Sequence, residues 1–263
     1  MEERSSSKAN RETIGYQIPI NEFKIDKNKE KEIRELLINK NFLQRAEYEK
    51  IEYDIKEAVR EGDIEMIEIL LSEEIEESGM IFKINRTRGT ASLFRIRSNA
   101  KDIVVPSSIT HSDETYLITS ISGSRNFEKK IKRLRFEPDS KVRTIHRNSF
   151  HNSTIEHLFI PPLLNELKSF WCNSRRLRRI DISGHNSNFV VKDERYLLSK
   201  SDPESDNFDV LVFAIGNPSE SEIPSNIKII SPYAFYKCTN MRKVTISTNS
   251  ELQSIGKYAF SET

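Results

Sequence analysis

The sequence predicts an α+β repeat protein, in which a small helical segment precedes a solenoid of short, stacked parallel strands. Three observations support this fold class. The stretch before Gly79 has helical composition and spacing, short apolar runs return at a nearly constant interval after it, and a second apolar pattern returns in the same register. A unit of this size cannot bury its apolar face alone, so each unit must stack on the next.

The helical segment is expected over residues 27–78, after an N-terminal tail at 1–26 that we expect to be disordered. It contains no Pro and a single Gly, Gly62. Asp63 follows at a position suited to cap a helix. Apolar residues recur at helical spacing in three stripes: Ile33, Leu36 and Leu37; Ile51, Ile55, Ala58 and Val59; and Ile67, Leu70 and Leu71. The tight connection predicts that the second and third helices run antiparallel.

The run from Ala58 to Leu71 resembles the helix–turn–helix of an ankyrin repeat. It has a small Ala before the Gly turn and an Ile-x-x-Leu-Leu face after it, without the Thr-Pro-Leu-His opening of that family. Only one unit of repeat length is visible, whereas about three are needed for a stable stack. The segment is therefore interpreted as a helical cap or as a diverged ankyrin repeat, with an ordinary helical hairpin as the third reading.

Strand-like runs follow Gly79, and each is followed by a turn. Their last apolar residues are 24 apart from Phe136 to Ile160, 22 apart from Ile160 to Ile182, and 23 apart from Ile223 to Ile246. An apolar residue also stands five positions before a Phe in Ile145…Phe150, Ile230…Phe235 and Ile255…Phe260. Two markers in one register indicate a repeat over about 79–263.

These residues carry a second resemblance. The run Phe235-Tyr-Lys-Cys238-Thr-Asn-Met241-Arg-Lys-Val244-Thr-Ile246 resembles the Phe-x-x-Cys-x-x-Leu-x-x-Ile-x-Ile unit of BspA-like leucine-rich repeats, and Ile160-Pro161 and Ile223-Pro224 resemble the Ile-Pro step of that family. The resemblance implies a leucine-rich-repeat solenoid that binds other macromolecules. It also implies a relationship to surface antigens and adhesion proteins.

One interval breaks the period. Ile182 and Ile223 are 41 residues apart, which is longer than one repeat. The excess contains two apolar runs, 195–198 and 208–215, with a polar, Pro-containing loop between them. We therefore expect a hairpin inserted in the solenoid at about 183–222.

The composition excludes several classes of protein. The 263 residues carry 41 Lys plus Arg and 40 Asp plus Glu, so the chain is not a uniformly basic nucleic-acid binder. Two cysteines, Cys172 and Cys238, are too few for a disulfide framework or a four-ligand zinc site. The longest apolar run, 210–215, is too short for a membrane helix. The N-terminus lacks the apolar stretch of a secretory signal, so the default expectation is a cytoplasmic protein, and the resemblance implies the cell surface as the alternative.

No catalytic, metal or cofactor site is predicted. The sequence contains no Cys-x-x-Cys, His-Glu-x-x-His, Gly-x-Ser-x-Gly or Walker motif, and its five histidines are scattered. The acidic loop from Asp202 to Asn207 lacks the Gly that a calcium loop requires at its sixth position. The sequence therefore favours a non-enzymatic binding protein.

The candidate binding residues follow from the strand register. If Leu134, Leu158, Ile180 and Val244 point inward, the residues just before them point outward. Adjacent strands lie about 4.8 Å apart, so Arg133, His157 and Arg179 would form a basic ladder. The outward set is Arg133, Arg135, His157, Phe159, Arg179 and Lys243. An ordinary solvated strand face is the simpler reading of the same residues.

Two functions are compatible with this face. The first is recognition of a protein partner, and the alternative is binding of a polyanion or nucleic acid through Arg133, His157 and Arg179. Phe159 is the only clear aromatic among them, which argues against a single-stranded nucleic-acid platform. The strand ending at Ile246 is also expected to expose a backbone edge, through which the chain could self-associate.

Overall fold

The structure is a computed structural model that describes residues 25, 27–39, 45–123 and 130–263. It divides into two compact units, Met1–Leu71 and Ser72–Thr263. The predicted tail at 1–26 falls almost entirely outside the described residues.

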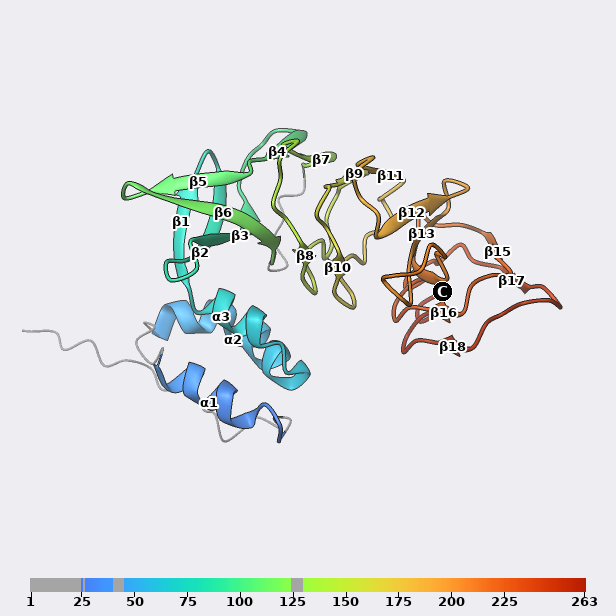
Figure 1. Cartoon of the computed structure of the whole chain (residues 1–263), viewed down its shortest axis with the longest axis horizontal. Helices are drawn as coiled ribbons and strands as arrows, with labels where there is room; N and C mark the ends of the chain where they lie inside the picture. Colours follow the sequence, from blue (N-terminus) through green and yellow to red (C-terminus); the bar gives the residue numbers. More distant parts are fainter. Residues whose placement is uncertain (1–24, 26, 40–44, 124–129) are drawn as a thin grey trace, which may run out of the picture. The chain divides into compact units, whose positions relative to one another are not determined.

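The first unit contains the helices α1 (Glu30–Asn39), α2 (Arg45–Glu61) and α3 (Ile64–Leu70) (Figure 1). The turn between α2 and α3 forms because Gly62 adopts a positive φ of 64° and the Asp63 side chain accepts a hydrogen bond from the backbone N–H of Met66. The predicted apolar stripes are buried here, including Ile33, Leu37, Ile55, Val59, Ile67 and Leu70.

The prediction of helix through residue 78 is wrong at its end. The third helix ends at Leu70, and Glu73–Glu77 forms strand β1, which pairs antiparallel with β2 (Met80–Asn85). The Glu-rich composition favours helix, but Ser78 and Gly79 both adopt positive φ and make a tight turn. Pairing with β2 and burial of Ile75 override the local propensity.

The second unit begins with antiparallel strands that lead into the solenoid. Strand β2 pairs antiparallel with β3 (Thr90–Ile96), and β5 (Ser108–His111) pairs antiparallel with β6 (Glu114–Ile121). Parallel stacking starts where β3 pairs with β6, and it continues through β8 (Thr144–Ile145) and β10 (Glu166–Leu167).

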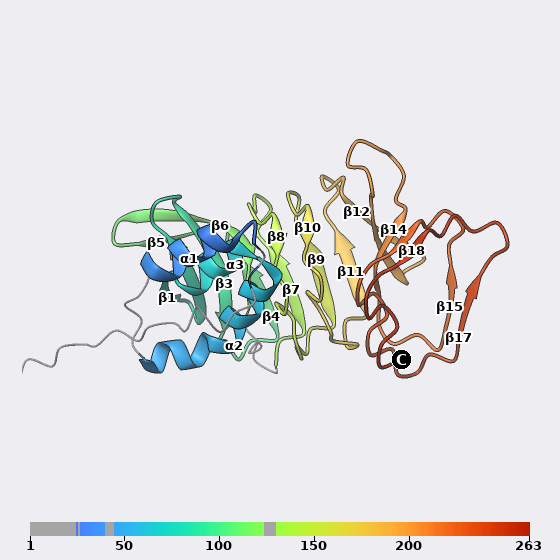
Figure 2. The same cartoon turned by 90° about the horizontal axis from the view of Figure 1, so that it is seen from below.

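The opposite wall is a four-stranded parallel sheet in the order β11-β9-β7-β4. Its strands are β4 (Asp102–Val105), β7 (Arg133–Phe136), β9 (His157–Ile160) and β11 (Arg179–Ile182). The fold is a β-solenoid of about 7 turns, which confirms the predicted fold class. Figure 2 shows the strands following one another along its axis.

The chain leaves the regular stack after β11. Strands β12 (Phe189–Lys192), β13 (Tyr196–Ser199) and β14 (Val210–Ala214) are joined antiparallel. Strand β14 then pairs parallel with β16 (Ile229–Ile230), and β16 pairs parallel with β18 (Ser254–Ile255). Strands β15 (Glu220–Ile223) and β17 (Lys243–Ile246) form a separate parallel pair.

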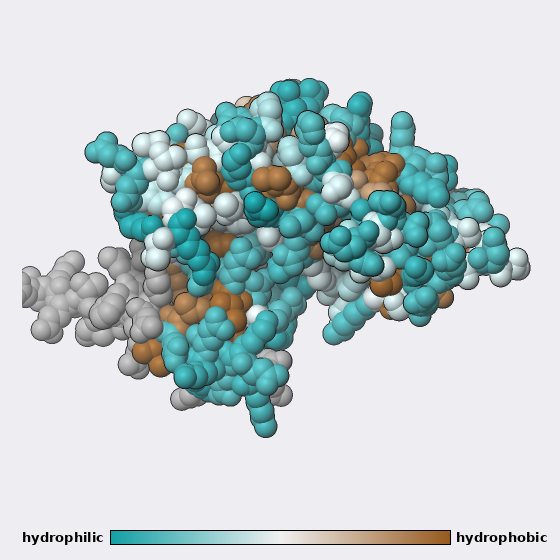
Figure 3. Space-filling view, viewed as in Figure 1, coloured by the Kyte–Doolittle hydropathy of each residue, from teal (hydrophilic) through white to brown (hydrophobic). Residues whose placement is uncertain are grey.

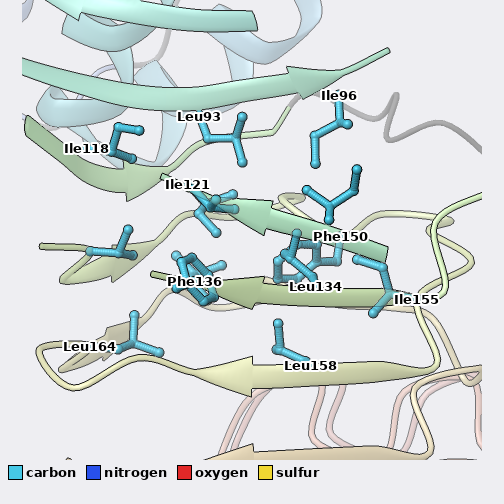
Figure 4. Close-up of a cluster of buried hydrophobic side chains, with 14 of the residues drawn as sticks. Leu93, Ile96, Ile118, Ile121, Leu134, Phe136, Phe150, Ile155, Leu158 and Leu164 are labelled. Atoms are coloured by element: carbon cyan, nitrogen blue, oxygen red, sulfur yellow. The ribbon is translucent and has the colours of Figure 1, made fainter. Parts of the chain in front are cut away.

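Apolar side chains from both walls fill the space between them. Figure 4 shows Ile121 and Leu164 from one wall and its turns facing Leu134, Phe136 and Leu158 from the other. These five side chains are almost fully removed from solvent. The repeat register therefore sets which residues face out, because alternate residues of each strand are committed to this core.

Candidate interaction surface

The outward side chains of β4, β7, β9 and β11 form one continuous surface, which we call the strand face. Its members stand in two rows, Asp102, Arg133, His157 and Arg179 in the first and Val104, Arg135, Phe159 and Asp181 in the second. The residues between the rows (Leu134, Leu158 and Ile180) are buried, so the outward orientation predicted from the sequence matches the observed burial.

The structure brings five of the six predicted site residues together. Arg133, His157 and Arg179 lie in register on neighbouring strands, with Arg135 and Phe159 in the second row. Lys243 is not among them. It lies on β17, opposite Glu220 of β15, in a different sheet.

Carboxylates within the strand face neutralise much of its positive charge. Arg133 Nε lies 3.5 Å from Asp102 Oδ1, and Arg179 Nε donates to Asp181 Oδ1 at 2.9 Å. His157 Nε2 lies 2.7 Å from Asp181 Oδ2. The sequence predicted a basic ladder from Arg133, His157 and Arg179 alone. The carboxylates that pair with them, Asp102 on β4 and Asp181 in the second row, can be placed only from the register between strands.

The pKa of Asp181 reflects this arrangement. Partial burial by itself would raise the pKa of this carboxyl group, but hydrogen bonds from Arg179 and His157 outweigh burial and hold the pKa below its ordinary value. The hydrogen bond that Arg179 donates to Asp181 also raises the pKa of Arg179. Asp181 therefore stays ionised and links two neighbouring strands.

Apolar area lies among these charges. Val104 is 44% exposed, and Phe159 of the same row is partly buried against the core. In Figure 3 the hydrophilic surface over these strands is interrupted by apolar patches. A surface of this kind, with paired charges around exposed apolar groups, resembles the mixed composition of protein interfaces.

A pocket of about 250 Å³ lies at the β11 end of the strand face. Ile180, Val191 and Ile215 give it an apolar lining, and Arg178, Arg179, Asp181 and Glu194 add the charged groups. The sequence did not predict this pocket, because Val191, Glu194 and Ile215 come from the irregular segment between two repeats.

A second surface that the sequence analysis missed is a row of aromatic turn residues, Phe170, Tyr233 and Tyr258. All three adopt positive φ, between 59° and 62°. The ring centroids of Phe170 and Tyr233 are 4.5 Å apart, and those of Tyr233 and Tyr258 are 5.3 Å apart. The signal was present in the sequence, since each residue stands two or one positions before the repeated Phe or Trp. Each ring contacts the next from turn to turn, so the row helps to hold the turns together.

The two cysteines lie close to one arginine, Arg175. Cys172 and Cys238 are buried free thiols, and burial raises the pKa of Cys172 to about 11. Arg175 donates to the backbone oxygen of Tyr236 at 2.5 Å and to that of Ala214 at 2.7 Å, and its guanidinium lies over the ring of Phe213. These groups are structural: a thiol with so high a pKa is a poor nucleophile, and Arg175 ties the two parts of the solenoid together.

No metal-binding cluster of three or more His, Cys, Asp or Glu side chains occurs in the part of the chain that the structure describes. Within those same residues, no helix has the length and apolar character needed to span a membrane.

Comparison with known proteins identifies the repeat. The profile described as "BspA type Leucine rich repeat region (6 copies)" matches residues 92–193 and 211–263. None of the curated proteins matches the chain.

Several solved bacterial structures resemble the chain at low identity. A leucine-rich cell surface protein from Faecalibacterium prausnitzii is 15% identical, with a TM-score of 0.36, and the match covers 72% of this chain and 73% of that one. The pneumococcal vaccine antigen PcpA is 15% identical, with a TM-score of 0.35 and coverage of 73% and 68%. A leucine-rich repeat protein from Eubacterium ventriosum is 16% identical, with a TM-score of 0.42 and coverage of 72% and 64%. The family match spans more than half of the sequence and coincides with the stacked strands, and this chain therefore belongs to the BspA-type leucine-rich repeat family.

Proposed function

We propose that this chain is a non-enzymatic scaffold that binds a protein partner through the strand face. The proposal rests on the mixture of apolar and charged side chains on that face. Val104 and Phe159 offer apolar contact area. Beside them, Arg133 pairs with Asp102, and Arg179 and His157 pair with Asp181. Prearranged charges of both signs favour selection of one complementary protein surface.

The same pairing argues against the polyanion alternative. A polyanion is attracted by cations that it can neutralise, and binding releases counterions in proportion to their number. In the first row of the strand face, Arg133 and Arg179 each have a carboxylate within 3.5 Å. A phosphate backbone would have to compete with Asp102 and Asp181 and would be repelled by them.

A binding assay with matched variants tests the proposal. The full chain is immobilised and exposed to an extract of its own cells, and a captured protein is then purified and its affinity measured. We expect the double variant Arg133→Glu/Phe159→Ala to weaken binding by at least tenfold. Arg88→Glu, which reverses one charge on the turn between β2 and β3, serves as the control and should bind like the original chain.

Salt separates the two candidate functions. A protein interface of mixed charge and apolar area should weaken only modestly as salt rises, whereas polyanion binding loses orders of magnitude over the same range. Equal binding by the double variant and the original chain would contradict the use of the strand face.

The expected cytoplasmic location stays a prediction.

A further inference from the structure

The wall that carries the strand face is interrupted between β11 and β15. Strand β11 pairs only with β9, and β15 pairs only with β17. Strand β12 lies next to β11 but pairs with β13 instead. Figures 1 and 2 both show β15 and β17 set apart from β11 along the axis. Two strand edges are therefore left without a strand partner in the described chain.

The edge of β11 presents backbone groups that nothing in the described chain uses. Arg179 N–H donates to the carbonyl of Glu156 at 3.1 Å, and Ser183 N–H donates to that of Ile160 at 3.0 Å. Successive residues of a strand direct their backbone groups to opposite sides, so Ile180 and Ile182 direct theirs away from β9. In the described residues no hydrogen bond occupies the N–H or C=O of Ile180 or Ile182 on that side.

The segment that follows β11 packs beside this edge without pairing with it. The turn between β12 and β13 places Asp193 and Glu194 at φ of 54° and 55°, and it returns the chain to the other wall. The 250 Å³ pocket lies against the edge, with Ile180, Val191 and Ile215 in its lining. Beyond the turn, the carbonyl of Glu222 on β15 accepts a hydrogen bond from the Tyr196 hydroxyl at 3.1 Å.

We propose that the edge of β11 binds an extended peptide segment of the partner protein, which adds a strand to the sheet and places one apolar side chain in the adjacent pocket. This inference rests on the proposed function and names the kind of segment that the strand face receives. The chemistry selects a polypeptide, because the alternating N–H and C=O groups of Ile180 and Ile182 match those of another extended backbone. The charged groups at the pocket are balanced, two arginines against Asp181 and Glu194, so the segment needs no strong charge.

A proline substitution tests the edge without dismantling the sheet. Ile182→Pro removes an N–H that the ladder with β9 does not use, and edge strands accept proline when its missing N–H faces away from the sheet. Ile182→Ala removes the same side chain but keeps the N–H, so it is the matched control. Both variants should show the circular dichroism spectrum of the original full chain.

The probe is a phage-displayed library of random linear peptides, selected on the full chain. We expect selected peptides to bind the original chain and Ile182→Ala alike, and to bind Ile182→Pro about tenfold more weakly or worse, as the loss of one backbone hydrogen bond at a desolvated edge implies. Amide exchange at Ile180 and Ile182 should be fast in the free chain and slow in the complex. Only every second N–H of the bound peptide faces β11. N-methylation of either the odd-numbered or the even-numbered peptide residues should therefore abolish binding, and methylation of the other set should not.

Other outcomes overturn the inference. Equal binding to the Pro and Ala variants, or no peptide enriched on the full chain, would show that the edge is not a peptide site. If the original chain dimerises and Ile182→Pro does not, the occupant is a second copy and not a partner segment. Another outcome is that selected peptides bind Ile182→Pro normally but fail to bind Arg133→Glu/Phe159→Ala. That result would contradict the peptide site at the β11 edge and would still support binding through the strand face.

Discussion

At the scale of single residues, the register places one aromatic ring of each repeat at the centre of its layer. Phe235 is fully buried and stacks on Phe260, with ring centroids 4.8 Å apart and an angle of 11° between the rings. Phe260 itself is only partly buried. The repeat spacing places Phe235 and Phe260 at equivalent positions, but only Phe235 is fully enclosed by the core.

Phe235→Ala should lower the free energy of unfolding by about 3 kcal/mol or more, because it removes a fully buried ring and leaves a cavity. Phe260→Ala should cost clearly less, since part of that ring is already in contact with water. Urea unfolding of both variants measures the difference. A loss below about 1 kcal/mol at Phe235 would contradict the repeat alignment.

Asp181 predicts how stability depends on pH. Its pKa is lowered in the folded state, so its stabilising effect is complete above its unfolded pKa and disappears as the pH falls through the folded value. The difference in unfolding free energy between the original chain and Asp181→Asn should therefore be constant near neutral pH and shrink below about pH 4. Denaturation curves across this range measure it, and a difference that grows as the pH falls would show that the sign is wrong.

At the scale of elements, close approach between neighbouring turns depends on one glycine. A Cβ atom at Gly256 would lie 2.3 Å from the backbone nitrogen of Pro232 in the preceding repeat. No L side chain fits without moving one turn relative to the next. Gly184 differs, because its Cβ would meet open space and its φ is not positive.

We therefore expect Gly256→Ala to destabilise the chain by about 2 kcal/mol through overpacking, and the control Gly184→Ala to stay within about 0.5 kcal/mol of the original. Thermal unfolding of the two variants checks the prediction. Equal midpoints would mean that the turns separate at little cost.

The turn between β12 and β13 is a second element that can be tested. Its two central residues, Asp193 and Glu194, both have positive φ, a geometry in which Asn-Gly is the preferred pair. Asp193→Asn/Glu194→Gly should raise the free energy of unfolding by about 1 kcal/mol, because it relieves a left-handed conformation at two non-glycine residues. Glu194→Ala keeps the strain and should give no gain. A destabilised double variant would indicate that these side chains make contacts worth more than the strain.

Much of the repeat could be read from the sequence, for a physical reason. Each of β7, β9, β11, β15 and β17 ends at an apolar residue whose spacing the stacking itself imposes, so the inward and outward positions follow together. The antiparallel strand β1 could not be read, because its Glu-rich sequence becomes a strand only through pairing with β2.

The candidate site was readable only in part. Arg133, His157 and Arg179 follow from periodicity, but their neutralisation depends on Asp102 and Asp181, whose positions require the register between strands. The pocket beside β11 and the interruption of the sheet arise from the aperiodic segment. Periodicity carries no information there. It assigned Lys243 to the outward set but could not show that β17 lies in a different sheet from β7, β9 and β11.

At the scale of the whole molecule, the second unit has an exposed strand at its β17 side. Strand β17 pairs only with β15 among the described strands, and Ile246, Ile255 and Tyr258 are each about half exposed nearby. An unpaired edge beside apolar surface favours pairing with another chain.

We therefore expect self-association that increases with protein concentration, measured by light scattering across a dilution series. Val244→Pro removes a backbone donor that faces away from β15 and provides a comparison at the edge itself. A strictly monomeric chain at high concentration, with amides of Lys243–Ile246 protected from exchange, would contradict this expectation.

The interrupted wall also makes the solenoid mechanically uneven. Along most of the stack, neighbouring turns are joined by backbone ladders on two walls, whereas among the described strands both ladders stop here, one after β10 and the other after β11. There the turns are joined by the core and by single bonds, such as those of Arg175 to Ala214 and Tyr236. Under tension along its axis, the solenoid should therefore break first at this interruption. Pulling would separate two groups of nearly intact repeats before either group unfolds.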